Sequence, residues 1–183
     1  FNISKNGQVE GRNTTKDIEI VPKKNKSGID IIIKPNVKNK SVHIPVIITV
    51  GGLKDLVYND FYIGHDADVL IVAGCGIHNK TCNNSEHNGI HSFHLEKNAR
   101  VKYVEKHVGE GNGSGGKILN PVTKIFMKEG SYMEMETLQL EGVTSTIRKT
   151  SAKLYDNATL HIQENILTTE NQTAKTIFKV ELL

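Results

Sequence analysis

A short turn frame recurs along this chain and limits what it can fold into. In each copy an acidic residue or Lys precedes Asn or Gly, a small residue follows, and polar and apolar positions then alternate. The copies are Lys97–Val104, Glu129–Glu136 and Asp156–Gln163, and Asp66–Ile71 fits the same frame. Asn98 and Gly130 are 32 residues apart, and Gly130 and Asn157 are 27 apart. Asn and Gly tolerate the left-handed backbone of a tight turn, and repeats of this period are typical of solenoids.

The segments between these turns have the composition of short strands. Candidate second strands are Thr123–Met127, Ser145–Thr150 and Lys175–Val180, and residues 95–183 show little sign of an amphipathic helix. Tryptophan is absent and aromatic content is 5%, so the core is built mostly from Ile, Val and Leu, which suits strands. The pattern predicts an all-β fold, a parallel β-helix. A β-sandwich is the alternative, but it requires hairpin turns between successive strands that the chain does not clearly provide.

The first third of the chain is less regular. Asp17–Val21, Gly28–Ile33 and Val42–Val50 are predicted strands, the last interrupted at Pro45. Leu53–Phe61 is predicted to form one helical turn or an irregular bridge. We therefore expect an N-terminal β-rich segment over residues 1–62 and the β-helix core over residues 63–183.

Charge and cysteine usage narrow the classes of function. The net charge is +3 with both signs interspersed, which does not indicate nucleic-acid binding. No run approaches the length of a transmembrane helix, and there is no signal peptide, so we expect no membrane partner. Two cysteines do not make a disulfide scaffold, which favours a reduced, cytoplasmic protein. Because the chain starts at Phe1 and stops in mid-pattern at Leu183, we expect a fragment truncated at its C-terminus.

One stretch holds most of the metal-ligating side chains. Residues 73–94 contain both cysteines and four of the eight histidines. Thiolates and imidazoles suit zinc, iron or an iron–sulfur cluster, and the spacings are compatible with a metal site. The candidate ligands are Cys75, His78, Cys82, His87, His91 and His94. On a strand His91 and His94 would face opposite sides, so both can serve one site only where the chain bends. The alternative is a small buried cysteine among ordinary polar histidines.

Two other motifs carry weaker chemical signals. Glu134 and Glu136 share a face of a predicted strand, as the carboxylates of a carbohydrate-active β-helix do, or they form a solvent-facing stripe. The Gly-rich stretch Gly109–Gly116 resembles a phosphate loop, but Lys117–Pro121 after it does not begin a helix. We expect a flexible loop between coils there.

Taken together, several segments resemble the SufB/SufD family, the scaffold components of the SUF machinery for iron–sulfur cluster assembly. The resemblance covers about residues 40–183 and is closest to the short SufB/SufD-like forms of anaerobes. It is carried by Val57–Gly64, Ala73–Asn79, His87–His91, Lys97–Tyr103, Ile118–Pro121 and Tyr132–Glu136.

This resemblance implies a right-handed parallel β-helix and a scaffold rather than an enzyme. It also implies a SufC-like ABC ATPase as partner and a homodimer or SufB/SufD-type heterodimer. The family's ATPase-docking helical segment and its best-known scaffold cysteine lie in later coils that nothing before Leu183 matches. The Cys/His stretch is then an early loop of the scaffold, attached to the coil that starts at Lys97. A structural solenoid without a metal site is the remaining alternative.

Overall fold

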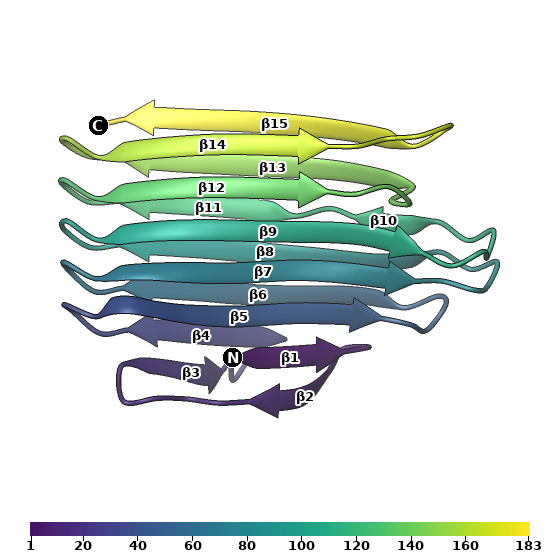
Figure 1. Cartoon of the computed structure of the whole chain (residues 1–183), viewed down its shortest axis with the longest axis horizontal. Coiled ribbons are helices and arrows are strands. Elements are labelled where there is room, and N and C mark those ends of the chain that lie inside the picture. Colours follow the sequence, from purple (N-terminus) through teal and green to yellow (C-terminus); the bar gives the residue numbers. More distant parts are fainter.

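Two sheets of stacked strands form one parallel β-helix in the computed structural model, which describes residues 1–183 (Figure 1). The first sheet contains, in spatial order, β14 (Thr159–Ile166), β12 (Tyr132–Gln139), β9 (Arg100–Glu110), β7 (Asp68–His78), β5 (Lys38–Ile48), β1 (Asn2–Lys5) and β2 (Gln8–Arg12). The second contains β10 (Lys117–Leu119), β13 (Ser145–Leu154), β11 (Val122–Met127), β8 (Ser85–Leu95), β6 (Lys54–Ile63), β4 (Gly28–Ile33) and β3 (Ile18–Pro22), with β15 (Thr173–Leu182) beside β13.

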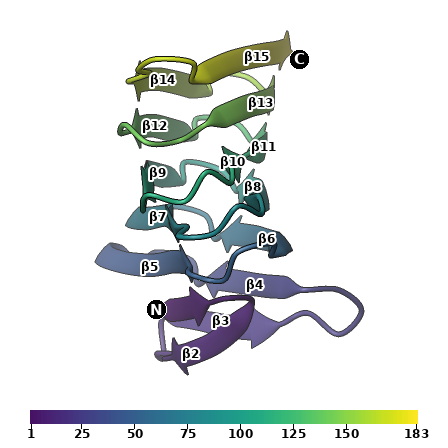
Figure 2. The same cartoon turned by 90° about the vertical axis from the view of Figure 1, so that its right-hand side faces the viewer.

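The chain passes from the second sheet to the first in every coil. The coils are β4–β5, β6–β7, β8–β9, β11–β12 and β13–β14, and their ladders are parallel. Figure 2 shows the two sheets facing each other across the lumen. The prediction of an all-β parallel β-helix is confirmed, and the antiparallel hairpins of a β-sandwich are absent from the coils.

The recurring turn frame makes the corner between the two sheets. Asn36, Asp66, Asn98 and Asn157 have φ between 56° and 62°, and Gly130 has φ 68°. Because few residues adopt this backbone without strain, the sequence marks each corner with Asn, Asp or Gly. The predicted turns are therefore confirmed, and the same frame occurs one coil earlier than the sequence had indicated.

Antiparallel strands close the N-terminal end of the solenoid. β2 pairs antiparallel with β1, and β3 pairs antiparallel with β4. Figure 2 shows these strands below the first coil. The parallel ladders begin at β4 and β5, so part of the segment 1–62 already belongs to the stack.

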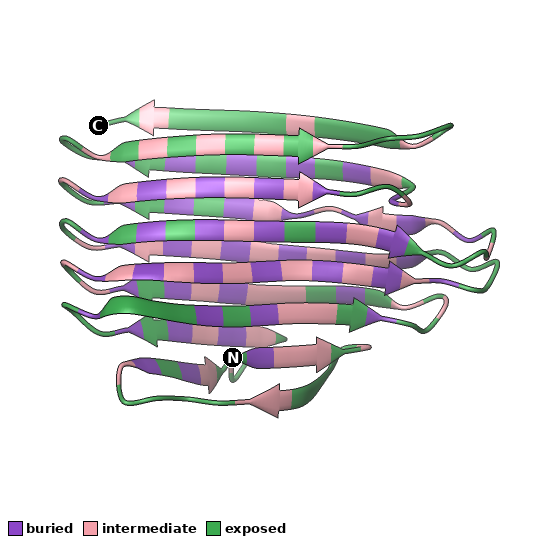
Figure 3. Ribbon diagram, viewed as in Figure 1, coloured by how far each residue is buried: buried purple, intermediate pink, exposed green.

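Aliphatic and aromatic side chains fill the lumen beside the corners where the backbone has positive φ. The rings of Phe61 and Phe93, from neighbouring coils, stack with centroids 4.4 Å apart, and both are fully buried. Burial of such side chains contributes about 1.5–3 kcal/mol each. Figure 3 shows burial alternating along the strands and fading in β14 and β15, where the inward Phe178 and Val180 remain half exposed.

Three local predictions were wrong. Residues 54–61 belong to strand β6 and do not form a helical turn or bridge. The Cys/His stretch is not mainly a loop, because β7 runs to His78 and β8 begins at Ser85. Pro45 does not interrupt its strand either. The alternation of β6 was hard to recognise because two of its inward residues, Asp55 and Asn59, are polar.

The Gly-rich loop between β9 and β10 lies directly on the loop between β7 and β8. A Cβ added to Gly111 would lie 2.3 Å from the carbonyl oxygen of Asn79, and one added to Gly113 would lie 2.4 Å from the backbone of Thr81. Backbone hydrogen bonds also join the two loops, including the one from Gly113 N to Asn79 O. The glycines thus allow the two loops to pack closely. The Gly-rich segment is a loop between coils and not a phosphate site.

Candidate functional site

The lumen of the β-helix is apolar beside the corners of positive φ and polar farther along the strands. β6, β8, β9 and β13 contribute inward polar side chains, each less than one tenth exposed. We call this group the polar chamber; it consists of Asp55, Asn59, His87, His91, Glu105, His107 and Arg148. Ionisable groups are rarely buried without a purpose, and clusters of them occur preferentially at functional sites. The polar chamber is therefore the candidate site.

Strand β8 provides two histidines that face the same space. His87, Gly89 and His91 occupy alternate positions, so all three point into the lumen. A Cβ placed on Gly89 would lie 3.1 Å from Nε2 of His91 and 3.4 Å from Nε2 of His87. The two ring nitrogens thus converge on the volume that any other side chain would fill.

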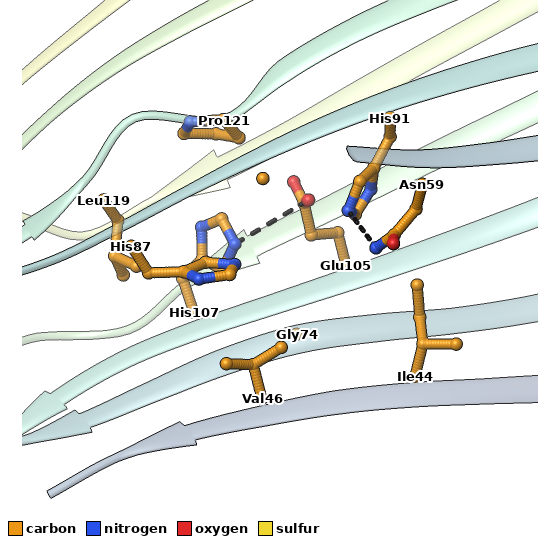
Figure 4. A pocket seen from close by; sticks show the side chains of 11 residues that line it. Ile44, Val46, Asn59, Gly74, His87, His91, Glu105, His107, Leu119 and Pro121 are labelled. Atoms are coloured by element: carbon orange, nitrogen blue, oxygen red, sulfur yellow. Dashed lines mark hydrogen bonds and ion pairs between the residues drawn. The ribbon is translucent and has the colours of Figure 1, made fainter. Parts of the chain in front are cut away.

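Hydrogen bonds fix the orientation of both rings. Nδ1 of His87 lies 2.8 Å from Oδ2 of Asp55; a carboxylate only accepts, so Nδ1 donates. Nδ1 of His91 donates to the Tyr103 hydroxyl at 2.8 Å, and that hydroxyl donates to Oε1 of Glu105 at 2.9 Å. Nε2 of His91 accepts a long bond of 3.4 Å from the Asn59 amide (Figure 4). These bonds place a proton on Nδ1 of each ring, which leaves Nε2 as the nitrogen that can bind an ion.

Arg148 is the buried positive charge of the polar chamber. Its guanidinium pairs with Glu105, donates to Nδ1 of His107 at 3.1 Å and reaches Oε1 of Glu164 at 3.2 Å. Figure 4 shows the Glu105 side chain between the rings of His107 and His91. Every polar atom of this ion pair therefore has a partner, which is the condition under which buried charges are tolerated.

Burial and these contacts set the protonation states. Burial lowers the pKa of His91 and of His107 to about 4, although Glu105 opposes the shift, so both rings are neutral near pH 7. Burial alone would raise the pKa of Glu105, but His107 and Arg148 hold it well below its ordinary value. Burial raises the pKa of the Cys75 thiol, and Asp55 and Glu105 raise it further. Near pH 7 the rings of His91 and His107 are thus neutral, Glu105 is ionised and Cys75 is a protonated thiol.

A cavity of about 20 Å³ lies among these residues. His87, Gly89, His91, Glu105 and His107 form its polar wall, and its apolar wall includes Ile44, Val46, Leu119 and Pro121. A volume of this size holds about one water molecule or one ion. The cavity is therefore suited to a single small polar occupant.

Three of the six ligands that the sequence indicated face the lumen. Cys75, His87 and His91 are buried, and Cys75 pairs in register with His107 on the next coil. The Cys75 side chain packs beside Leu119, next to the polar chamber. The prediction of a metal site thus keeps its two central histidines and one thiol.

The other three ligands lie outside the lumen. His78 is partly exposed at the end of β7, and Cys82 is exposed in the loop before β8. His94 points to the outer face, where its ring stacks between those of Tyr62 and Phe126 at 5.0 Å. His91 and His94 thus face opposite sides, as their spacing indicated. No three His, Cys, Asp or Glu side chains are close enough together to hold a metal ion by themselves.

The position of the two cysteines limits the kind of metal group that these residues can hold. A protein-bound iron–sulfur cluster is held mainly by cysteine thiolates. Only Cys75 faces the lumen, and Cys82 lies on the outside. The residues therefore do not fit a cysteine-ligated cluster in the polar chamber, whereas the two imidazoles supply two of the ligands that a single iron or zinc ion needs.

Sequence reasoning missed five members of the polar chamber: Asp55, Asn59, Glu105, His107 and Arg148. The 32-residue period could have found some of them, because Asp55 pairs with His87 and Asn59 with His91 on the next coil. No comparable signal pointed to Arg148, since arginine is rarely buried.

The acidic pair on β12 lies on the outer face. Glu134 and Glu136 are both partly exposed, and Lys102 on the neighbouring strand lies 2.9 Å from the first carboxylate and 3.6 Å from the second. Their shared face is thus a solvated one, with a lysine between the two carboxylates.

Comparison with models of protein families, with curated protein sequences and with solved structures gave no significant match. The structure has no helix that could cross a membrane. The class that the fold defines is that of parallel β-helix proteins, and the function must be argued from the polar chamber.

Proposed function

We propose that this protein is a non-enzymatic scaffold for iron–sulfur cluster assembly, of the SufB/SufD kind, that binds iron inside its β-helix. The observation that carries the proposal is the polar chamber, where two imidazole Nε2 atoms, buried carboxylates and a nearby thiol meet in the lumen. The parallel β-helix is also the fold that the sequence resemblance implies. Neither feature alone indicates this function, but together they favour it over a purely structural solenoid.

The cargo of this scaffold is a single ferrous ion and not a completed cluster. Imidazole nitrogens and carboxylate oxygens suit ferrous iron, and zinc is the alternative occupant because it accepts the same ligands. A cation also suits the charges, since Asp55 and Glu105 are both buried while Arg148 is the single buried positive charge among them. Cys75 pairs in register with His107 on the next coil, and its thiolate is a ligand for iron once the thiol is deprotonated.

The proposed partners are a SufC-like ABC ATPase and a second SufB/SufD-type chain, acting in the cytoplasm. Both partners are what the resemblance to the SufB/SufD family implies. Measuring the molar mass in solution and co-purifying the chain with such an ATPase would test this part of the proposal.

Anaerobic loading with ferrous iron tests the binding function. The chain is mixed with ferrous salt with and without sulfide, desalted, and analysed for iron and for visible absorption. We expect iron to be retained by the wild type and lost in His91→Gln. His94→Gln is the matched control, because His94 is on the same strand but points outward.

A Cys75→Ser variant separates iron from sulfur. If Cys75 binds the iron only when sulfide is added, the variant should retain iron but lose the visible absorption that appears with sulfide. Failure of the wild type to retain iron, or equal retention by wild type and His91→Gln, would contradict the proposed function.

A further inference from the structure

We propose that the space above Gly89 is a binding seat for one divalent cation of the ferrous or zinc type, held by Nε2 of His87 and Nε2 of His91. The seat rests on the metal-binding part of the proposed function but not on its role in iron–sulfur assembly. Four observations lead to it: the glycine between the histidines, the orientation of the rings, the charge around them, and the cavity beside them.

Gly89 provides the room for the cation. A methyl group at this position would lie 3.1 Å from Nε2 of His91, which is closer than ordinary contact, and 3.4 Å from Nε2 of His87, at the lower limit of ordinary contact. The backbone of Gly89 does not have the positive φ that favours glycine. The close approach of the two imidazoles is thus the structural reason for a glycine here. An ion bound at about 2.0–2.1 Å from each nitrogen would draw the rings slightly closer together.

Both rings are already oriented as metal-bound histidines usually are. A ligating imidazole commonly donates its second N–H to a carboxylate or another oxygen, which fixes the ring and makes the metal-binding nitrogen more basic. His87 donates directly to Asp55 at 2.8 Å. His91 donates at 2.8 Å to Tyr103, which donates in turn to Glu105. Nε2 of His87 makes no side-chain hydrogen bond, and Nε2 of His91 accepts only the 3.4 Å contact from Asn59, which a bound ion would replace.

The surrounding charge favours a cation over an anion or a neutral ligand. Two buried carboxylates, Asp55 and Glu105, support the rings, and Arg148 is shared between Glu105 and a further carboxylate, that of Glu164. The excess of negative charge among these buried groups means that a divalent cation stabilises the site electrostatically.

The coordination of this seat is incomplete, which suits a cargo and not a permanent structural ion. Structural zinc is normally held by four protein ligands. No third His, Cys, Asp or Glu completes a protein-only site. The remaining positions are left to the cavity of about 20 Å³ beside the two histidines, which has room for about one water molecule (Figure 4). The seat therefore binds an ion reversibly and leaves positions for a second ligand.

A second cavity offers a route to the seat. It measures about 60 Å³, lies between the N-terminal hairpin and the first coils, and shares Ile44, Val46 and Asn59 with the cavity beside the seat. The Asn59 side chain lines both cavities: its amide nitrogen contacts Nε2 of His91 at 3.4 Å, and its Oδ1 accepts a hydrogen bond of 3.2 Å from the backbone N–H of Ile29. An ion that enters by this route would require Asn59 to swing aside and give up the bond from Ile29.

Cobalt(II) titration tests the seat. Cobalt accepts the same ligands as zinc, and its visible absorption reports coordination by nitrogen. Displacement of bound cobalt by zinc then gives the affinity for zinc. We expect the wild type to bind one cobalt ion and Gly89→Ala to bind it about tenfold more weakly or worse, because its methyl fills the seat and leaves both ligands present. Asp55→Asn is nearly isosteric and should weaken binding by about 10–100-fold. Cys82→Ser and His94→Gln, both outside the lumen, should bind as the wild type does.

Thermal melting without metal shows that each variant is folded, and if Gly89→Ala fails this check Asp55→Asn decides the result. Undiminished cobalt binding by a folded Gly89→Ala or Asp55→Asn protein overturns the seat but leaves metal binding elsewhere intact. Loss of cobalt in Cys82→Ser overturns the seat in favour of the outer loop. No binding of cobalt or zinc by the wild type overturns the seat and the proposed function together.

Discussion

Replacing Arg148 with methionine tests whether the polar chamber is held together by its charges. Arg148 is 2% exposed, and it is the partner of Glu105, also 2% exposed. Arg148→Met keeps much of the apolar volume but leaves the Glu105 carboxylate buried without its guanidinium. The change is therefore an electrostatic one at a site that water hardly reaches.

The expected loss of stability follows from this burial. Removing one partner of a buried ion pair costs about 3–5 kcal/mol, because the remaining charge is uncompensated. In Glu105→Gln/Arg148→Met the fully buried pair carries no charge, and only the partly exposed Glu164 loses a partner, so the double variant should be clearly more stable than the sum of the single effects. The exposed pair of Lys102 and Glu134, 2.9 Å apart, is the control, and Lys102→Met should cost at most about 1 kcal/mol.

Urea unfolding at pH 7, followed by far-ultraviolet circular dichroism, measures these free energies. The reasoning predicts a large loss for Arg148→Met, a partial recovery in the double variant and almost no change in Lys102→Met. An Arg148→Met protein as stable as Lys102→Met would refute it. Strict additivity of the two single variants would also refute it, because the side chains would then not be coupled.

Two further predictions concern protonation and loop packing. The pKa of His107 is about 4 in the folded chain against an ordinary 6.5, so the unfolded state binds more protons between these values. His91 has a similarly lowered pKa, so stability should fall as the pH decreases from 6.5 toward 4 by roughly 3 kcal/mol for each of the two rings, and His107→Gln should remove about half of this slope in urea midpoints. Gly111 has φ +92° and contacts Asn79, so Gly111→Ala should cost at least about 1 kcal/mol, whereas Gly76→Ala, with only an ordinary 3.5 Å contact, should change the melting temperature little.

The corners of the β-helix could be predicted from the sequence because they depend on local backbone chemistry. Asn98, Gly130 and Asn157 mark positions of positive φ, which few residue types accept. The distance in sequence from one corner to the next equals the number of residues in one coil. The recurrence of Asn or Gly at this spacing was therefore enough to predict a solenoid.

The interior of the polar chamber could not be predicted in the same way. Strand prediction assumes that apolar residues point inward, but in β13 the polar Arg148 faces the lumen and Ile147 is 44% exposed. β6 was missed for a related reason, since Asp55 and Asn59 are inward. Where the lumen is polar, polar residues point inward and apolar residues point outward, which is the reverse of the usual strand pattern. Only the register with neighbouring coils then reveals which side chains meet.

Anomalous diffraction from crystals grown with ferrous or cobalt ion tests the central claim most directly. The account predicts one strong anomalous peak inside the β-helix above Gly89, at about 2.1 Å from Nε2 of both His87 and His91. A peak at Cys82 or His78 on the outside, or a well-ordered polar chamber with no anomalous peak, would contradict it.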